Sequence, residues 1–375
     1  MARSLWLGIA ATFAITLSAV LPSAAQDTGP IKIGLIQPTK SLLGKQAVQA
    51  AEIAVKLIAE DGGVLGGRQI ELIVYDDAFS PVEAVGAAQR LINEDGVKFI
   101  AGQFSSTASL AVVPLVEASD VLYVAAVPKH PDVTESGSNR VFRLNSTTAM
   151  DAEVFGDFLR EDLKPESVAY LGENNDFGRA TLDLLKEILA DKPNSGIASS
   201  ALFDVNQSDF TAMLTEARVS GADTLFTGGS NVEQYANVIR DAAEIGFTPK
   251  NVILAPGTLN QRVVDLAGEA ADGAVSVDIY VPSFDNPLNK RFVDAYQATF
   301  GDIPEKTEEL SFEAVWLIAK AVDVAGTADD TDRIAEALRG NTWDTPRGPV
   351  IFNEKGQAIS ETFVVEVDGQ QIVRR

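Results

Sequence analysis

A regular alternation of strand-like and helix-like segments restricts the fold of this chain more than any other feature. From Ile31 onward, short runs rich in Val, Ile and Leu alternate with longer segments whose apolar residues recur at helical spacing. The strand-like runs occupy residues 31–38, 68–77, 97–102, 121–127, 166–174, 196–205, 222–229 and 250–257. This alternation predicts an α/β protein with parallel sheets that carry helices on both faces.

The length of the chain predicts two such sheets. Its 375 residues exceed what one ordinary core accommodates. We therefore expect two Rossmann-like lobes. The alternation breaks near residues 142–151, 273–287 and 347–357, where polar or Pro-rich runs interrupt it. We interpret these breaks as three crossings that form a hinge between the lobes; the alternative is three ordinary loops.

The N-terminal segment has the pattern of a signal peptide at residues 1–25. Arg3 supplies the positive charge, residues 5–21 are apolar, and Ser23, Ala24 and Ala25 form a cleavage site before Gln26. This pattern predicts export to the periplasm. A membrane anchor is the alternative, but the apolar run is near the lower length limit for a membrane span.

Composition excludes several classes of function. The chain has no cysteine, so it has neither disulfides nor thiolate metal sites. Its net charge of −23 disfavours nucleic acid and anionic membrane surfaces as partners. We expect a monomer without cofactor or metal.

The glycine-rich stretch at residues 62–67 invites comparison with a phosphate-binding loop. However, it follows a helical pattern and precedes a strand, which is the reverse of the order in such loops. Gly62 and Gly63 are typical of a helix C-terminus, and the pair at 66–67 of a tight turn. Asp76 and Asp77 could begin a cation site, but a solvated strand end is the simpler reading.

Ligands of open parallel sheets bind beyond the carboxyl ends of the strands, where helix N-termini point. Ser105, Ser106 and Thr107 lie between a strand and a helix start, and their hydroxyls and backbone N–H groups could bind a carboxylate or phosphate. Helix capping is the alternative role of these residues. Lys129 follows the next strand and could pair with a ligand carboxylate; the alternative is a solvated loop lysine.

Loops of the second half supply the remaining candidates. Phe177 could form an aromatic wall or pack in a core. Ser230 and Asn231, and Gly257 with Thr258, follow two further strands and offer hydrogen bonds. Recognisable catalytic motifs are missing, so we expect a binding protein rather than an enzyme.

Several motifs in order resemble the periplasmic binding proteins of branched-chain amino acid ABC transporters. They are "GGVLGGRQIELIVYDDAFSPVEAV", "FIAGQFSSTAS", "ENNDFG", "DFTAMLTEARVSGADTLFTGG" and "GPVIFNEKGQ". The resemblance implies a type I periplasmic binding fold, whose two lobes are joined by a three-stranded hinge and close over a small ligand. It implies lobe 1 at residues 27–146 plus 279–348, lobe 2 at 147–278 plus 349–375, and an inner-membrane permease as partner.

The same resemblance implies site residues. The serine that anchors the ligand α-carboxylate falls on Ser106. The next strand edge falls on Val127 and Lys129, where lysine replaces the family's threonine. The family's tyrosine falls on Phe177, and its aromatic residue after two glycines falls on Ser230.

The family's acid for the ligand ammonium falls near Gly257, where the chain has no acid. An unpaired ammonium in a closed site is costly. We therefore expect a ligand more anionic than a neutral amino acid, such as an organic acid, an aromatic carboxylate or an acidic amino acid. Ordinary amino acids remain open if Glu173 or Glu233 replaces the lost acid. A periplasmic sensor subunit on the same fold is the alternative function.

Overall fold

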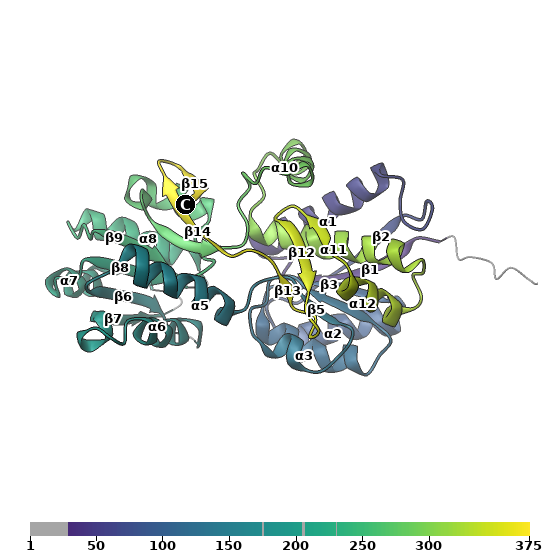
Figure 1. Ribbon diagram of the computed structural model, residues 1–375, viewed down its shortest axis with the longest axis horizontal. Coiled ribbons are helices and arrows are strands. Elements are labelled where there is room, and N and C mark those ends of the chain that lie inside the picture. Colours follow the sequence, from purple (N-terminus) through teal and green to yellow (C-terminus); the bar gives the residue numbers. More distant parts are fainter. Residues whose placement is uncertain (1–28, 175, 205–206, 230) are drawn as a thin grey trace, which may run out of the picture.

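Two parallel-rich sheets flanked by helices form the protein, as the alternation of segments predicts (Figure 1). The computed structural model describes residues 29–174, 176–204, 207–229 and 231–375. The predicted signal peptide lies outside the described residues. Within them, no helix combines the length and apolar character needed to cross a bilayer.

The first lobe is built on a parallel five-stranded sheet with the order β2-β1-β3-β4-β5. The chain packs helices from two distant parts of the sequence on this sheet. Its strands are β1 (Ile31–Gln37), β2 (Ile70–Asp76), β3 (Phe99–Gly102), β4 (Leu122–Ala125) and β5 (Val141–Arg143). Its helices are α1 (Leu42–Glu60), α2 (Pro81–Asn93), α3 (Ser106–Glu117), α4 (Asp132–Glu135), α10 (Pro287–Phe300), α11 (Lys306–Ala325) and α12 (Thr331–Gly340).

The second lobe is built on a seven-stranded sheet with the order β15-β14-β10-β9-β8-β6-β7, in which β14 and β15 run antiparallel to their neighbours. Its strands are β6 (Val168–Glu173), β7 (Ile197–Phe203), β8 (Thr224–Gly228), β9 (Asn251–Leu254), β10 (Val275–Asp278), β14 (Phe363–Asp368) and β15 (Gln371–Arg374). Its helices are α5 (Thr148–Asp157), η1 (Phe158–Leu163), α6 (Asp176–Ile188), η2 (Pro193–Gly196), α7 (Thr211–Val219), α8 (Val232–Glu244), α9 (Gln261–Ala267) and η3 (Gly268–Ala271).

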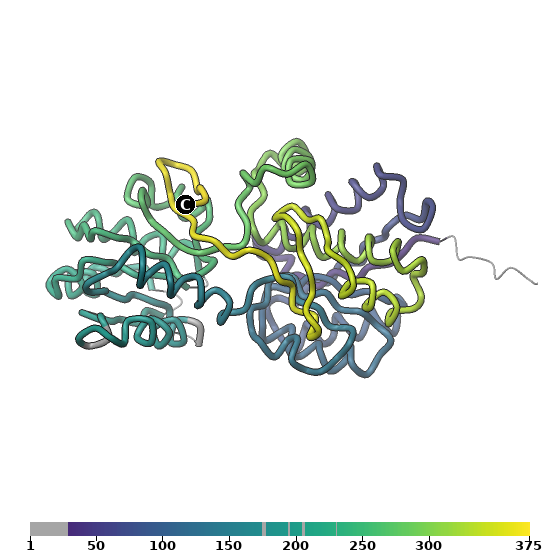
Figure 2. Tube along the Cα trace, in the orientation of Figure 1, coloured from purple at the N-terminus to yellow at the C-terminus, as the bar shows by residue number. Residues whose placement is uncertain are grey.

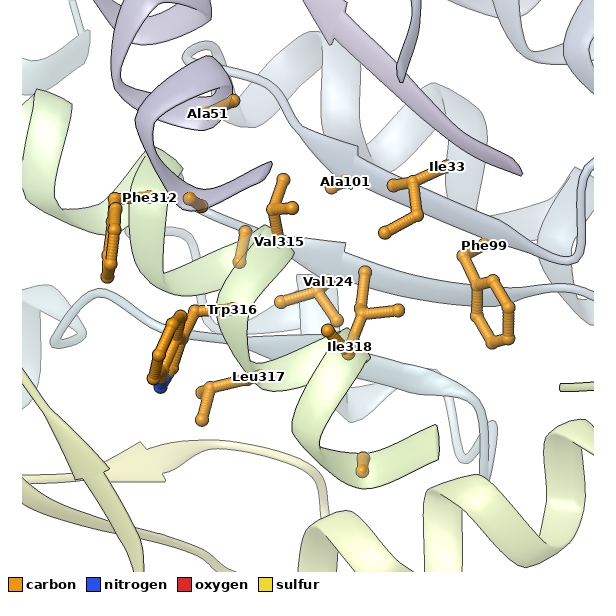
Figure 3. Close-up of a cluster of buried hydrophobic side chains, with 14 of the residues drawn as sticks. Ile33, Ala51, Phe99, Ala101, Val124, Phe312, Val315, Trp316, Leu317 and Ile318 are labelled. Atoms are coloured by element: carbon orange, nitrogen blue, oxygen red, sulfur yellow. The ribbon is translucent and has the colours of Figure 1, made fainter. Parts of the chain in front are cut away.

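The first sheet is buried on both faces because alternate residues of its strands enter two separate cores. Leu122 and Val124 of β4 pack on the α1 and α11 side, whereas Tyr123 and Ala125 pack on the α2 and α3 side. Figure 3 shows Val315 and Ile318 of α11 among side chains of β1, β3 and β4. Strands buried on both faces read as continuous apolar runs, which explains why they were visible in the sequence.

The glycine-rich stretch has the architectural role that its sequence position indicated. Gly62, Gly63, Gly66 and Gly67 all have positive φ, between 79° and 131°, and carry the chain from the end of α1 into β2. Residues with a Cβ adopt such angles at a cost. At the start of α2, the Ser80 hydroxyl caps the helix by accepting the N–H of Glu83.

Three segments carry the chain between the lobes (Figure 2). The first follows β5 and the second follows β10. The third leaves β13 (Ala358–Ile359), which belongs with β11 (Trp343–Thr345) and β12 (Gly348–Phe352) to a small antiparallel sheet. Val350, Phe352 and Ala358 lie in the same core as Ile33.

The packing therefore differs from the lobe boundary expected after residue 348. Residues 349–359 pack with lobe 1, because the turn at Asn353–Gly356 returns the chain toward β5 as a hairpin. A single short strand looked like the crossing itself. Nothing in its residues distinguishes a strand that crosses from one that turns back.

Sequence patterns also missed part of the helical structure. Helices α5, α9 and α12 are short, at 10, 7 and 10 residues, so each offers few turns in which a helical spacing can be recognised. Helix α11 begins at Lys306 and ends at Ala325. Its first turns carry charged residues that would ordinarily be exposed, yet Glu308 and Glu309 are buried.

A buried arginine connects two of the three crossings. The Arg347 guanidinium donates to both carboxylate oxygens of Glu313 on α11, at 2.8 and 2.7 Å. It also donates to the Leu144 carbonyl in the first crossing, at 3.0 Å, and to the Ser360 hydroxyl in the third, at 2.9 Å. Both charged side chains are fully buried, so each compensates the charge of the other in the absence of water.

Replacing Arg347 with Met should lower the free energy of unfolding by about 3–5 kcal/mol, because Glu313 is then buried without its partner. Denaturant unfolding followed by circular dichroism measures the loss. Arg160→Met is the matched control, since Arg160 pairs with Asp157 at the surface and should change stability by less than about 1 kcal/mol. Equal losses in the two variants would contradict a structural role for the buried pair.

Candidate functional site

The N-terminus of α3 faces the loop that follows β4. The sequence candidates Ser106 and Lys129 therefore lie side by side, as predicted from their places after neighbouring strands. Ser105 is the N-cap, and its hydroxyl accepts the N–H of Ala108. The first intrahelical bond runs from the Ser109 N–H to the Ser105 carbonyl. The N–H groups of Ser106 and Thr107 therefore have no partner within the helix and can bind an anion.

Ser106 differs from its neighbours because its hydroxyl connects two loops. Its Oγ accepts the N–H groups of Lys129 and His130, each at 3.3 Å. The hydroxyl hydrogen is still available to donate to a ligand. Thr107 is exposed at the helix surface, and the Val127 carbonyl accepts a hydrogen bond from the Asn145 side chain.

Lys129 is not a solvated loop lysine, because its ammonium reaches the second lobe. Its Nζ pairs with the Asp151 carboxylate in the first turn of α5 and lies 3.4 Å from the Ser146 hydroxyl. The side chains of Lys129 and Asp151 are 22 % and 3 % exposed. The pair thus joins the two lobes beside the α3 N-terminus.

A second lysine makes a parallel contact. Lys306, the first residue of α11, donates to Asp278 at 3.0 Å and to the Gly257 carbonyl at 2.9 Å, and both acceptors belong to lobe 2. Burial lowers the pKa of Lys306, and the nearby Asp278 carboxylate opposes that shift. Lys129 and Lys306 converge on Gly257, where an added Cβ would lie 3.2 Å and 2.5 Å from their respective Nζ atoms.

A third polar contact between the lobes involves a carboxyl group with a shifted pKa. Glu305 accepts the backbone N–H of Gln261 at the start of α9. Burial, reinforced by the Glu308 carboxylate, raises the pKa of Glu305 to about 8. Glu308 accepts the Glu305 N–H and is itself buried, which raises its pKa to about 7.

The remaining candidates of lobe 2 are partly accounted for. Asn231 caps α8 by accepting the Glu233 N–H. The Thr258 hydroxyl donates to the Ala255 carbonyl, next to Gly257. Phe177 lies in α6, but its side chain, like the whole of Ser230, lies outside the described residues.

The acids considered at the sequence level have other partners. Glu233 pairs with Arg262 at 2.8 Å, and both side chains are about half exposed. Glu173 is buried at the end of β6 and also interacts with other groups of the protein. Asp76 pairs with Lys40 and accepts the Thr39 N–H, whereas Asp77 accepts the Phe79 N–H. Among the described residues, no cluster of acids or histidines suits a metal ion.

Sequence reasoning found one half of the contact between the lobes and missed the other. Asp151, Asp278 and Lys306 were not among the candidates, although they pair with or lie beside residues that were. Asp151 lies in the first turn of α5, within the run at 142–151 that we interpreted as a break, and Lys306 begins α11 directly after the loop at 301–305. An acid placed four residues after a Thr cap was the available signal for Asp151.

Two shallow cavities lie away from these residues. The larger, of about 420 Å³, is lined by residues of the loop at 136–140 together with Glu117 and Asp332. The smaller, of about 120 Å³, adjoins it near Glu354 and Lys355. Both belong to the surface of lobe 1, and neither borders Ser106 or Lys129.

Comparison with known proteins gives one consistent result. Residues 30–371 match the family model described as periplasmic binding protein. The leucine-, isoleucine-, valine-, threonine- and alanine-binding protein of Pseudomonas aeruginosa is 31 % identical over 351 residues, which cover 92 % of this chain and 90 % of that protein.

Solved structures agree on the fold. A solute-binding protein of an ABC transporter from Rhodopseudomonas palustris, in complex with 3,4-dihydroxybenzoic acid, superposes with a TM-score of 0.80 at 25 % identity, covering 92 % of this chain and 96 % of that one. The branched-chain amino acid transporter substrate-binding protein of Streptococcus pneumoniae, in complex with isoleucine, gives a TM-score of 0.80 at 18 % identity, covering 92 % and 100 %.

Replacing Glu305 with Gln should flatten the dependence of stability on pH. The pKa of Glu305 rises from 4.5 to about 8 on folding, so between these values the folded state holds a proton that the unfolded state has lost. Stability conferred by this group therefore falls as the pH rises from 5 to 8. Glutamine keeps an oxygen that accepts the Gln261 N–H but cannot titrate.

Urea unfolding at several pH values measures this effect, and Glu305→Gln should remove up to about 1.4 kcal/mol per pH unit of the slope. Glu336→Gln, on the exposed face of α12, serves as the control and should leave the slope unchanged. An unaltered slope in Glu305→Gln would show that Glu305 is ionised throughout this range.

Proposed function

Because the chain belongs to the periplasmic binding protein family, we propose that it captures an amino acid or related small carboxylate between its lobes and delivers it to the permease of an ABC importer. The family is one of binding proteins, not enzymes. The proposal extends to the N-terminal segment, which we assign as a signal peptide that directs the chain to the periplasm, and to a monomeric state.

The main support for the proposal is that a potential anion site, the N-terminus of α3, lies next to Lys129, which contacts the second lobe. The α3 N-terminus offers two N–H groups without intrahelical partners and the Ser106 hydroxyl. Ser106 Oγ also accepts the N–H of Lys129, whose ammonium pairs with Asp151 of lobe 2. A carboxylate bound to the first lobe would therefore lie where the second lobe makes contact.

The named ligands of similar proteins indicate which chemical group the ligand of this chain carries. The Pseudomonas aeruginosa relative is named for binding leucine, isoleucine, valine, threonine and alanine, and the Rhodopseudomonas palustris structure holds an aromatic carboxylate. Both kinds of ligand carry a carboxylate, which suits the α3 N-terminus. The carboxylate is thus the feature that we assign to the ligand of this chain, with Ser106 as its anchor.

The mechanism that follows is capture without chemical change. The ligand carboxylate binds to the first lobe through α3, and the second lobe then closes over it. A ligand that contacts both lobes binds the closed form more tightly than the open form, so it shifts the population toward closure. The permease would recognise that closed shape.

Replacing Ser106 with Ala should weaken ligand binding by about 10- to 100-fold, the value of one hydrogen bond to a charged group. The ligand is first found by thermal-shift screening of amino acids and aromatic carboxylates, and its affinity is then measured by calorimetry. Ser106→Thr keeps the hydroxyl and should retain most of the affinity.

Ser105→Ala provides the structural comparison. It removes the N-cap of α3 and should lower stability by about 1 kcal/mol, with a smaller effect on affinity than Ser106→Ala. If Ser106→Ala lowers the melting temperature but leaves affinity intact, Ser106 supports the loop and does not anchor the ligand.

A further inference from the structure

Gln103 has an unusual place and conformation for a polar residue. It follows β3 directly and lies just before Ser105, the N-cap of α3. Its φ is 65°, in the left-handed region that few residues other than glycine adopt, and the φ of the preceding Gly102 is also positive, at 103°. Its side chain is fully buried, although it ends in an amide. A buried polar residue in a strained conformation beside a candidate site points to a functional constraint.

The main chain of Gln103 is fixed on both sides. Its N–H donates to the Ile36 carbonyl of β1 at 2.8 Å, and its carbonyl accepts the N–H of Val127, after β4, at 3.3 Å. These two bonds extend the sheet beyond the end of β3, so Gln103 cannot shift without breaking them. The conformation of this residue therefore sets the direction in which the chain enters α3.

The side chain of Gln103 is held by a tyrosine of the neighbouring strand. The Tyr123 hydroxyl, in β4, donates to Gln103 Oε1, and both side chains are fully buried. A buried amide oxygen without a donor is costly, so this bond keeps the side chain in the interior. Burial raises the pKa of Tyr123, and the Ser109 hydroxyl opposes that shift. Because Ser109 also donates to the Ser105 carbonyl at 3.0 Å, the network reaches the N-cap of α3.

An acid from the loop after β2 lies near the other end of the same amide. Asp77 is fully buried, and its carboxylate accepts the N–H of Phe79 at 3.0 Å. Burial raises the pKa of Asp77, and the Phe79 N–H and the Gln103 amide oppose that shift. Among the described residues, Gln103 Nε2 has no other hydrogen-bond partner. The Phe79 ring also meets the Phe104 ring edge-on, with centroids 5.6 Å apart, so this loop supports two successive residues before α3.

We propose that Gln103 is a positioning residue of the binding site: its buried amide, held by Tyr123 and Asp77, fixes the left-handed turn that aims the first N–H groups of α3 at the ligand carboxylate. This assignment rests on the proposed function, because it concerns the same carboxylate site. Gln103 acts through those amides and not by contact with the ligand. Amides that are already held in the bound orientation lose less freedom when the ligand binds, and affinity rises accordingly.

The test measures affinity in variants that remove the network and differ in whether they tolerate the turn. The mature protein is freed of co-purified ligand by unfolding and refolding, and is then titrated calorimetrically with L-leucine, L-glutamate and benzoate. The compound that binds the wild-type protein most tightly is the probe for every variant. All titrations are made at a temperature at which circular dichroism shows the variants to be folded, so a residue needed only for folding would leave the affinity unchanged.

Gln103→Ala should weaken binding of the probe by about 10-fold or more, because the contacts of the amide are lost and a residue with a Cβ disfavours positive φ. Gln103→Gly loses the same contacts, but glycine adopts the turn without strain. It should therefore bind the probe at least about 3-fold more tightly than Gln103→Ala, although it removes more of the side chain.

Tyr123→Phe keeps the buried ring and removes only the hydroxyl, so it tests the network even if Gln103→Ala does not fold. It should weaken binding by about 3- to 10-fold. Tyr296→Phe is the matched control, because the Tyr296 hydroxyl likewise donates to a glutamine oxygen, that of Gln49, at 3.2 Å. Tyr296 packs in the core on the opposite face of the first sheet from Tyr123, so the control should lose stability but not affinity.

Wild-type affinity in both Gln103→Ala and Tyr123→Phe would overturn the positioning role and leave the proposed function intact. Equal affinities of Gln103→Ala and Gln103→Gly would also overturn it, because the turn would then not matter. Equal losses of affinity in Tyr123→Phe and Tyr296→Phe would do the same, because the place of the bond would then not matter. Failure of the wild-type protein to bind any of the three compounds would contradict the proposed function and this assignment together.

Discussion

The arrangement of the two lobes depends on one buried ion pair. Arg347 and Glu313 satisfy each other's charge, and the remaining donors of the guanidinium hold the first and third crossings at Leu144 and Ser360. Glu313 lies on α11, whose other residues pack into the core of lobe 1. These two crossings are therefore fastened to the interior of one lobe.

Side chains with ionisable groups make several contacts between the lobes, which suits the opening and closing of the proposed mechanism. Lys129, Lys306 and Glu305 reach Asp151, Asp278 and the Gln261 amide from the opposite lobe. Apolar surface would hold the lobes closed at a cost for every opening, whereas separated ions are solvated by water. Helix α11 serves both purposes, because its N-terminal turn meets the second lobe and its later turns build the core.

Elements could be predicted from the sequence where all their residues are apolar and buried. They could not be predicted where polar residues are buried. The strands of the first sheet enter cores on both faces, so runs such as that of β4 are apolar throughout and easily recognised. The first turn of α11 and the start of α5 carry Glu308, Glu309 and Asp151, whose burial the sequence does not show. Asp151 pairs with Lys129 of the other lobe, whereas Glu308 accepts the N–H of Glu305 in its own first turn. Ser106 and Lys129 were identifiable because they follow strand ends, but Asp151, the partner of Lys129 in the second lobe, was not.

At the proposed carboxylate site, the α3 N-terminus offers main-chain amides and one hydroxyl, and main-chain amides are the same whatever side chains surround them. The portion of the site that grips a carboxylate is accordingly indifferent to most substitutions. Under the proposed function, discrimination between ligands would fall instead to a few side chains of the opposite lobe. After gene duplication, substitutions at those few positions could change the ligand that one copy binds. Its carboxylate site would be inherited unchanged.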